Sequence, residues 1–310
     1  MIYNKSMNEE KLNLVLDILN EKTQQNFTIQ KNAYESLYEN LQAIIDTNFV
    51  DVQNKLFVLP CGDYFTHTFY DNSIVDFYVI FKTNKDEIDF SIVDQKITKK
   101  GKKANTYSQI MNRPMVSGSL QAEDIAKRLS DQILGTIKTL SIFQKRNQIM
   151  LRLNGDVIAR ITVCYDFSEP NGELTCRNVN IWKQINPVKY LEKIDKKRLE
   201  TDNNFELIAR LFKALEMELV LNQESNIIIG KNYFVENLLF NVPSELFKSD
   251  SVYNTIYKIL AFLRLKDYKT FRLIDETDFM YKQDFYSKNY AKQFINKIEY
   301  ALENLDELLK

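Results

Sequence analysis

Near residue 187 the pattern of this 310-residue sequence changes. Before that point, apolar residues at helical spacing alternate with β-rich runs, and after Pro187 the β-rich runs nearly vanish. We therefore expect an α+β chain in which a small mixed sheet with flanking helices precedes an all-helical part. The helices expected in the second part lie near residues 203–222, 231–240, 251–265 and 284–309.

The first part contains one strong hairpin signal. Asn154-Gly155-Asp156 separates two β-rich runs, 148–153 and 157–165, and Asn-Gly between such runs is typical of a hairpin turn. Asp156 is therefore interpreted first as a turn residue. The other elements expected are helices at 8–22, 31–46 and 121–142 and strands at 55–60 and 73–81.

Composition excludes several classes of protein. Lys and Arg number 41 against 42 Asp and Glu, so the net charge of −1 does not indicate a cationic face for duplex DNA. The three cysteines, Cys61, Cys164 and Cys176, are an odd and scattered set, which excludes a disulfide framework and a zinc site and favours a reducing cytoplasm. We interpret His67, the single histidine, as a packed or surface residue, because no Ser or Cys nucleophile motif accompanies it.

We also expect no membrane association. No uninterrupted apolar stretch approaches the roughly 18–20 residues of a membrane-spanning helix, and the first residues lack the apolar segment of a signal peptide. The glycine motifs GxGxxG and GxxxxGK[ST] are absent, so a phosphate site would have to use another motif.

The strand expected at 73–81 carries an acid among apolar residues. Alternation places Asp76 and Tyr78 on one face, whereas the opposite face is apolar. Burying a carboxylate there requires a cation, a metal ion or hydrogen-bond donors. The other interpretation is an edge strand whose Asp76 lies at the solvent end. Twelve residues separate Asp76 from the pair Gly62-Asp63, which follows the preceding strand.

This spacing resembles a motif of the DNA polymerase β-like nucleotidyltransferases, in which Gly-Ser or Gly-Gly precedes Asp-x-Asp or Asp-x-Glu in a strand. Here the corresponding residues are Gly62-Asp63 and Asp76-Phe77-Tyr78. The chain is most similar to the branch that contains poly(A) polymerases, oligoadenylate synthases and the cGAS/DncV-like synthases of cyclic nucleotides.

Three segments extend the resemblance over about residues 30–305. Residues 181–190 resemble the Trp…Pro segment that leads into the helical domain of the family. The helix with Arg210 and Lys213 resembles its Arg-x-x-Lys helix, and residues 232–243 resemble its Ser-Tyr-x-x-Glu…Pro helix, with Asn232 in place of Ser.

The resemblance implies two domains and a phosphoryl-transfer site. A nucleotidyltransferase-like domain would span residues 1–185, and a helical domain of residues 186–310 would form the other wall of the cleft. In an active enzyme, carboxylates that include Asp76 would hold two Mg²⁺ or Mn²⁺ ions. The residues implied to contact the nucleotide are Gly62, Asp63, Arg210, Lys213 and Asn232.

The sequence departs from this pattern at three positions. Asp63 replaces the Ser, and a carboxylate repels a triphosphate. Tyr78 replaces the second acid, and a tyrosine does not hold Mg²⁺ at neutral pH. The third acid aligns with Arg160, which leaves Asp76 as the one matching metal ligand. An intact metal centre would need Asp63 or Asp156 as a further ligand.

Arg160 itself has two interpretations. It faces solvent from its strand, or it pairs with Asp76 and replaces the metal ions by a guanidinium–carboxylate bridge. In the second case the former catalytic centre stays folded without cations.

These departures lead to two main hypotheses. In the first, the chain is a catalytically degenerate nucleotidyltransferase that needs no metal and acts as a nucleotide- or RNA-binding or protein-interaction module. In the second, it is an active Mg²⁺- or Mn²⁺-dependent enzyme that makes oligo- or cyclic nucleotides or tails RNA. The expected partners are accordingly a nucleoside triphosphate, a short RNA or a protein. A third hypothesis is an interaction subunit that uses no nucleotide, such as an immunity partner.

Overall fold

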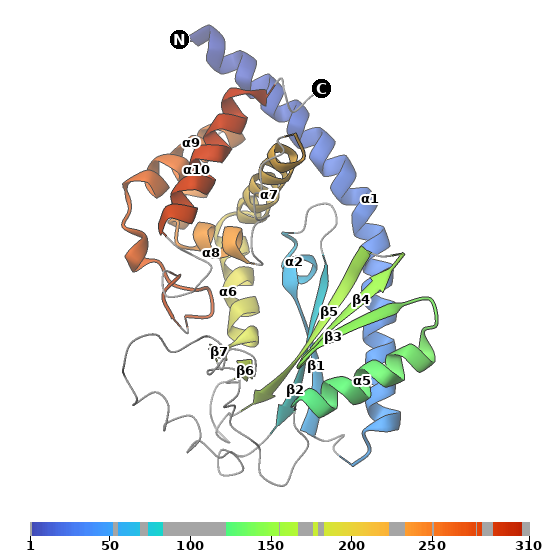
Figure 1. Ribbon diagram of the computed structural model, residues 1–310. Coiled ribbons are helices and arrows are strands. Elements are labelled where there is room, and N and C mark those ends of the chain that lie inside the picture. The colour runs from blue at the N-terminus through green and yellow to red at the C-terminus, as the bar shows by residue number, and fades with distance from the viewer. Residues whose placement is uncertain are drawn as a thin grey trace. The chain divides into compact units, whose positions relative to one another are not determined.

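The computed structural model contains two compact units (Figure 1). Unit 1 consists of Met1–Ala33, Gly62–Ser73 and Val188–Lys310, and unit 2 consists of Tyr34–Cys61 and Ile74–Pro187. Unit 1 thus combines segments from both sides of residue 185, and a domain boundary at 185/186 stays a prediction. The structure describes residues 2–51, 55–68, 74–82, 122–154, 156–166, 176–178, 183–222, 233–249, 251–276, 278–280 and 288–305.

One long helix, α1 (Ile2–Asn48), replaces the two helices expected at 8–22 and 31–46. The expected break has no physical cause, since residues 2–48 contain neither proline nor glycine. The helix contributes to both units, because Leu12 lies in the core of unit 1 and Leu41 in the core of unit 2.

Unit 2 is built, in its described residues, on a seven-stranded mixed sheet. Strands β1, β2, β5, β4 and β3 follow one another across the sheet, while β6 pairs with β5 and β7 with β6. β2 and β5 run parallel, and the other pairs are antiparallel. A mixed sheet followed by helices confirms the α+β fold class. The strands are β1 (Leu56–Cys61), β2 (Val75–Lys82), β3 (Ser141–Lys145), β4 (Gln148–Leu153), β5 (Asp156–Asp166), β6 (Cys176–Asn178) and β7 (Lys183–Ile185).

The hairpin expected around Asn154 is confirmed, since β4 and β5 pair antiparallel and Asn154 has a φ of 53°. The helix expected at 121–142 is too long. Helix α5 covers Ala122–Thr136, and residues 141–145 form β3 along the edge of β4. Pairing with β4 is a tertiary contact, and the local apolar spacing gives no indication of it. Strands β6 and β7 were not predicted either, because they also depend on pairing with a neighbouring strand.

The two faces of the sheet differ in their packing. Phe77 and Val79 of β2 belong to a large apolar cluster that includes residues of α5 and of the second part of α1. On the opposite face, the described residues form a much smaller cluster around Ile80 and Cys164. Alternation places Asp76 on this second face, so its carboxylate does not enter the main core.

The described part of unit 1 is helical. Helices α7 and α9 agree with the expected segments 203–222 and 251–265. Helix α6 was not expected, although Pro187 is a favourable first helical residue. None of the described helices is both long and apolar enough to cross a membrane. The helices are α2 (Gly62–Phe65), α6 (Pro187–Glu200), α7 (Asn204–Asn222), α8 (Phe234–Phe240), α9 (Val252–Leu265) and α10 (Lys288–Glu303), with short 3₁₀ turns at Ser244–Phe247 and Tyr268–Thr270.

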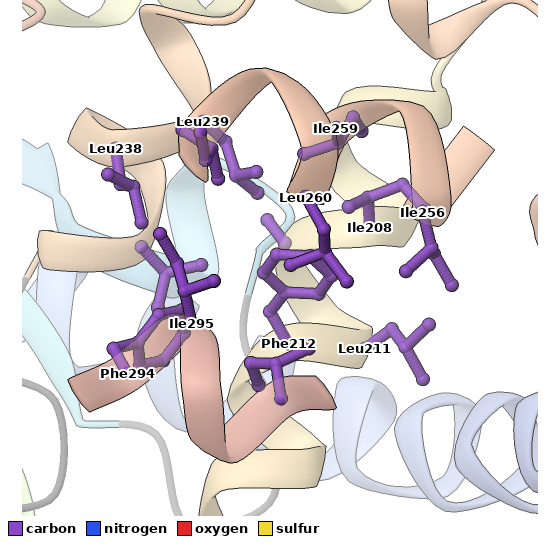
Figure 2. Packing of buried hydrophobic residues seen from close by; sticks show 14 of the residues in the cluster. Ile208, Leu211, Phe212, Leu238, Leu239, Ile256, Ile259, Leu260, Phe294 and Ile295 are labelled. Atoms are coloured by element: carbon purple, nitrogen blue, oxygen red, sulfur yellow. The ribbon is translucent and has the colours of Figure 1, made fainter. Parts of the chain in front are cut away.

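An aromatic and aliphatic core joins these helices (Figure 2). Phe294 of α10 lies edge-on to Phe234 of α8, with ring centroids 5.3 Å apart, and 6.2 Å from Phe212 of α7. Ile256 and Ile259 of α9 belong to the same cluster. This core fixes the positions of α7 and α8, which carry the polar residues described below.

A buried lysine belongs to the same unit. Lys197 of α6 is 6% exposed, and its ammonium donates a hydrogen bond to the carbonyl oxygen of Val242. The ammonium also lies 5.7 Å from the ring centroid of Phe240 and 5.2 Å from that of Phe247. Burial lowers the pKa of Lys197 to about 8, although nearby glutamates act in the opposite direction.

The lowered pKa predicts a pH-dependent stability. Between about pH 8 and pH 10.5 the folded protein binds fewer protons at Lys197 than the unfolded chain, so the free energy of unfolding should rise with pH across this window. The rise is at most about 3 kcal/mol. We expect Lys197→Met to lack it. Chemical denaturation of both proteins across this pH range checks the prediction, and parallel stability curves would contradict it.

Candidate functional site

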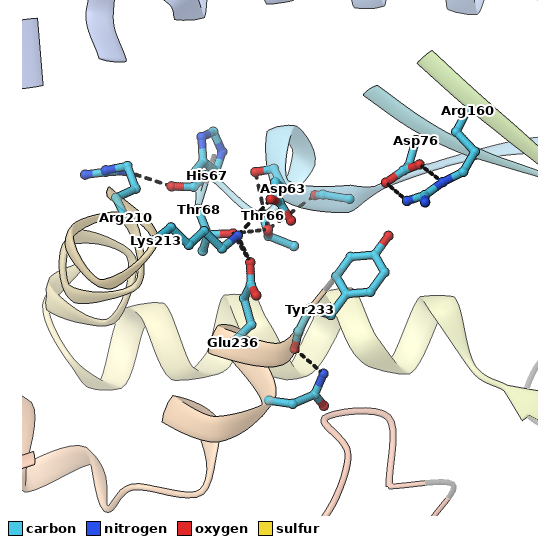
Figure 3. Close-up of polar contacts among 12 residues, drawn as sticks. Asp63, Thr66, His67, Thr68, Asp76, Arg160, Arg210, Lys213, Tyr233 and Glu236 are labelled. Atoms are coloured by element: carbon cyan, nitrogen blue, oxygen red, sulfur yellow. Dashed lines mark hydrogen bonds and ion pairs between the residues drawn. The ribbon is translucent and has the colours of Figure 1, made fainter. Parts of the chain in front are cut away.

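In unit 2, the acid of β2 is paired with an arginine of β5 (Figure 3). Asp76 and Arg160 are direct neighbours in the parallel register of the two strands. Arg160 donates from Nε to Asp76 Oδ1 at 2.7 Å and from Nη2 to Oδ2 at 2.8 Å. The side chain of Asp76 is 10% exposed and that of Arg160 is 19% exposed, so this is a largely buried, bidentate ion pair. The interpretation in which Arg160 pairs with Asp76 is confirmed, and the one in which it faces solvent is wrong.

Tyr78 lies two residues after Asp76, on the same face of β2. Its side chain packs against the small cluster around Ile80 and Cys164. Burial, followed by the proximity of Cys61, Cys164 and Asp76, raises the pKa of the Tyr78 phenol well above its usual value. The phenol therefore stays protonated and neutral at physiological pH, and it is no anionic metal ligand.

The divalent ions expected of a phosphoryl-transfer centre do not fit the residues around Asp76. Both carboxylate oxygens of Asp76 accept hydrogen bonds from Arg160, and the guanidinium occupies the place next to Asp76 where a further acid was expected. Among the residues that the structure describes, no group of three or more His, Cys, Asp or Glu side chains is placed to hold a metal ion. A metal ion at Asp76 would have to displace a guanidinium from a buried bidentate pair.

The two other acids considered as metal ligands have different places. Asp156 begins β5 and is the register partner of Leu153 at the end of the hairpin, but its side chain lies outside the described part of the structure. Asp63 lies in α2 of unit 1, where its carboxylate meets a lysine. A metal role for either residue stays a prediction.

The turn that contains Asp63 is held by backbone and hydroxyl contacts. Gly62 has a φ of 88°, a conformation that favours glycine, and it begins the short helix α2. The amide of Thr66 donates to the Gly62 carbonyl at 3.1 Å, and the amide of Thr68 donates to the Asp63 carbonyl at 3.0 Å. The two threonine hydroxyls lie 2.8 Å apart, and both threonines are buried. The segment is therefore a defined turn.

Lys213 of α7 joins this turn to α8 (Figure 3). Its ammonium lies 2.8 Å from Asp63 Oδ2 and 3.3 Å from the hydroxyl of Thr68, and it also contacts Glu236 Oε1. The Thr68 hydroxyl donates to the same Glu236 oxygen. We call Asp63, Thr66, Thr68, Lys213 and Glu236 the Lys213 cluster.

The Lys213 ammonium attracts both carboxylates of the cluster, whereas Asp63 and Glu236 repel each other. Burial alone would lower the pKa of Lys213, but the Asp63 and Glu236 carboxylates outweigh it, so that the pKa of Lys213 is raised and the ammonium is charged at neutral pH. For Glu236, whose side chain is fully buried, burial outweighs the attraction of Lys213 and raises its pKa. One lysine thus serves two carboxylates of its own chain.

Two predicted contact residues remain, Arg210 and Asn232. Arg210, one turn before Lys213 on α7, donates from Nη1 to the backbone carbonyl of His67 at 2.7 Å and so holds the same turn. Asn232 lies outside the described residues. Tyr233, the next residue, has a φ of 68°, and its ring lies edge-on to Tyr190 with centroids 5.3 Å apart.

Sequence reasoning did not assign a role to Glu236 or Thr68. Glu236 is the one acid of a mostly apolar helix, Phe234–Phe240, and this pattern is a usable signal, because a buried carboxylate requires a cation or donors. Thr68 carried no signal, since its contact with Glu236 spans 168 positions of the sequence.

A known protein family matches the helical half of the chain. Residues 192–303 match the family described as the cGAS/DncV-like nucleotidyltransferase C-terminal helical domain. No curated protein matches the sequence.

Solved structures match most of the chain. The CdnE c-UMP-AMP synthase of Rhodothermus marinus, solved with Apcpp and Upnpp, has a TM-score of 0.63 at 16% identity, covering 86% of this chain and 89% of its own. The CdnE cyclic dinucleotide synthase of Elizabethkingia meningoseptica, solved with GTP and Apcpp, has a TM-score of 0.61 at 14% identity, covering 86% and 91%. CdnC of E. coli MS115-1, in complex with HORMA-deltaN, has a TM-score of 0.56 at 12% identity, covering 92% and 90%. At these identities the similarity establishes a shared fold.

Proposed function

We propose that this chain, which has the cGAS/DncV-like nucleotidyltransferase fold and the C-terminal helical domain that the sequence resemblance implied, is a catalytically degenerate relative of the cyclic nucleotide synthases that share this fold. It acts as a binding module in the cytoplasm and uses neither Mg²⁺ nor Mn²⁺.

The observation that carries this proposal is the bidentate pair of Arg160 with Asp76. Two-metal phosphoryl transfer requires converging carboxylates whose oxygens are available to the metal ions. Here the guanidinium takes both oxygens of Asp76, and the neutral phenol of Tyr78 stands where the second acid was expected. The centre is thus neutralised by the chain's own cation, and the charge that paired metal ions need is missing.

A protein is the partner that these observations favour. The net charge of −1 does not favour a nucleic acid. Lys213, which contacts the 62–68 turn, is engaged by two carboxylates, and Arg210 donates to the His67 carbonyl of the same turn; both contacts disfavour a nucleoside triphosphate. CdnC of E. coli, which shares the fold, has been solved in complex with HORMA-deltaN, so this fold can present a surface to another protein. Tight binding of a short RNA in an anisotropy titration would instead favour a nucleic-acid module.

The catalytic part of the proposal is tested by incubation with labelled nucleoside triphosphates and Mg²⁺ or Mn²⁺. We expect no nucleotide product above the background given by the variant Asp76→Ala. The comparison with this variant removes any contaminating activity. The alternative is an active nucleotidyltransferase that makes oligo- or cyclic nucleotides or tails RNA, and product that disappears in Asp76→Ala would establish it.

A further inference from the structure

Strand β3 lies at one end of the sheet, and β4 is the one described strand that pairs with it. The hairpin between β3 and β4 has a two-residue turn, so Lys145 and Gln148 close it as a hydrogen-bonded pair. Alternation along the antiparallel ladder then directs the backbone N–H and C=O groups of Ile142 and Gln144 away from β4. Within the described part of the chain, this edge therefore offers backbone donors and acceptors to a further strand.

The strands at the two ends of the row from β1 to β3 differ in how their outer edges are protected. Exposed edge strands usually carry a proline, a charge or a bulge that prevents pairing with another chain. Strand β1 contains Pro60, which lacks the N–H group that a further strand would need. Residues 141–144 of β3 contain neither proline nor a charged residue, and the side chain of Phe143 is 48% exposed. The edge of β3 thus has the features of a surface that accepts a strand.

The segment around β3 is positively charged. Residues 132–155 contain four basic residues and no acid, although the whole chain has a net charge of −1. Arg152 is the register partner of Ser141, and its guanidinium lies 5.8 Å from the ring centroid of Phe143. An acidic strand would complement this edge, whereas a second copy of the chain would bring like charges together. The four basic residues are Lys138, Lys145, Arg146 and Arg152.

We propose that the edge of β3 is a docking site for an acidic, extended segment of a partner protein, which adds to the sheet as a further strand. The backbone of this segment pairs with Ile142 and Gln144. An apolar side chain packs on Phe143, and carboxylates two positions away on either side lie near Lys145 and Arg152. This inference deepens the proposed function and rests on its protein partner, because it names the surface and the chemistry of that partner. It does not depend on the loss of the metal centre.

The test uses the full chain and a synthetic peptide with this pattern, acetyl-Glu-Val-Leu-Val-Glu-amide. Its Leu is designed to oppose Phe143, and its two Val residues to pair with Ile142 and Gln144. We expect saturating peptide to slow the amide hydrogen exchange of Ile142 and Gln144 at least about tenfold, because these amides then donate within the sheet. Two control peptides carry Lys in place of both Glu, or N-methyl groups on both Val. Each should bind at least about tenfold more weakly in an anisotropy titration of the labelled peptides.

Two variants of Gln144 separate backbone pairing from side-chain contacts. Gln144→Pro removes the outward N–H and should weaken peptide binding about tenfold, whereas Gln144→Thr keeps the N–H and should bind as wild type does. Both variants lose the hydrogen bond that the Gln144 side chain donates to the carbonyl oxygen of Arg146 at 2.9 Å, so this loss is matched. If Gln144→Pro does not fold, the N-methylated peptide tests the same contact on the wild-type chain.

Several outcomes would overturn the inference. Slow exchange of the Ile142 and Gln144 amides in the free chain would mean that the edge is already paired. A control peptide that binds as tightly as its parent would exclude strand addition or charge recognition. Protection of the same amides by self-association, or by a short RNA that displaces the peptide, would assign the edge to a different occupant. A peptide without effect on exchange would overturn this inference alone, whereas metal-dependent turnover of nucleoside triphosphates would overturn the proposed catalytic loss and leave the peptide result unchanged.

Discussion

Replacing Arg160 with methionine is expected to lower the free energy of unfolding by roughly 2–4 kcal/mol. The variant keeps most of the side-chain volume but removes the guanidinium from Asp76, whose side chain is 10% exposed. A carboxylate in so buried a place needs a compensating charge, so its loss is much more costly than that of a surface ion pair. Equilibrium denaturation in urea measures the change.

Two further variants are needed to interpret this result. In the double variant Arg160→Met/Asp76→Asn we expect recovery of more than half of the lost stability, since the uncompensated charge is gone. Asp51→Asn, which breaks the exposed pair with Arg128 in the same unit, should leave the unfolding midpoint unchanged. If millimolar Mg²⁺ restored the stability of Arg160→Met, Asp76 would be a competent metal ligand and the proposed function would lose its main support.

Lys213→Met is the second variant with a large expected effect. It leaves Asp63 and the fully buried Glu236 without their shared ammonium, and the expected loss of stability is about 3 kcal/mol. The loss lies at the low end for buried ion pairs, because Glu236 has a raised pKa and can take up a proton. Thermal and urea denaturation of the unliganded protein measure it.

Comparing Lys213→Met with a control variant shows whether Lys213 stabilises the fold or is reserved for binding a ligand. A lysine reserved for an external phosphate could be replaced at little cost to the unliganded protein, since functional sites are often not optimised for stability. Lys193→Met is a suitable control in the same unit, because its partner Glu276 is 37% exposed and keeps a second pair with Lys189. We expect less than about 1 kcal/mol for this control. Equal effects of the two variants would contradict the structural role of Lys213.

Much of the fold was accessible from local patterns. The helix at 203–222 and the strand with Asp76 follow from apolar spacing, and the hairpin follows from Asn154-Gly155. The errors occurred where a neighbour decides the structure. Residues 141–145 become a strand because β4 offers an edge for pairing, whereas the local spacing continued the preceding helix.

The sequence predicted which residues of the candidate site depart from the family pattern, but it did not predict all of their contacts, because these depend on tertiary structure. The departures at Asp63, Tyr78 and Arg160 could be read from the sequence once the resemblance was recognised, and the pairing of Arg160 with Asp76 was one of two interpretations. The contact of Lys213 with Asp63 was not anticipated, because the two residues had been assigned to the same phosphate groups rather than to each other. Two opposite charges near one turn satisfy each other when no ligand separates them.

The sequence by itself determined the kind of chain: its α+β class, its resemblance to nucleotidyltransferases and the positions at which acids are missing. These properties depend on residue types and short spacings. Only the tertiary structure decided that Arg160 meets Asp76 across 84 positions and that Lys213 serves both Asp63 and Glu236. Such contacts depend on strand register and helix packing, which bring residues together after the chain has folded and leave no periodic trace in the sequence.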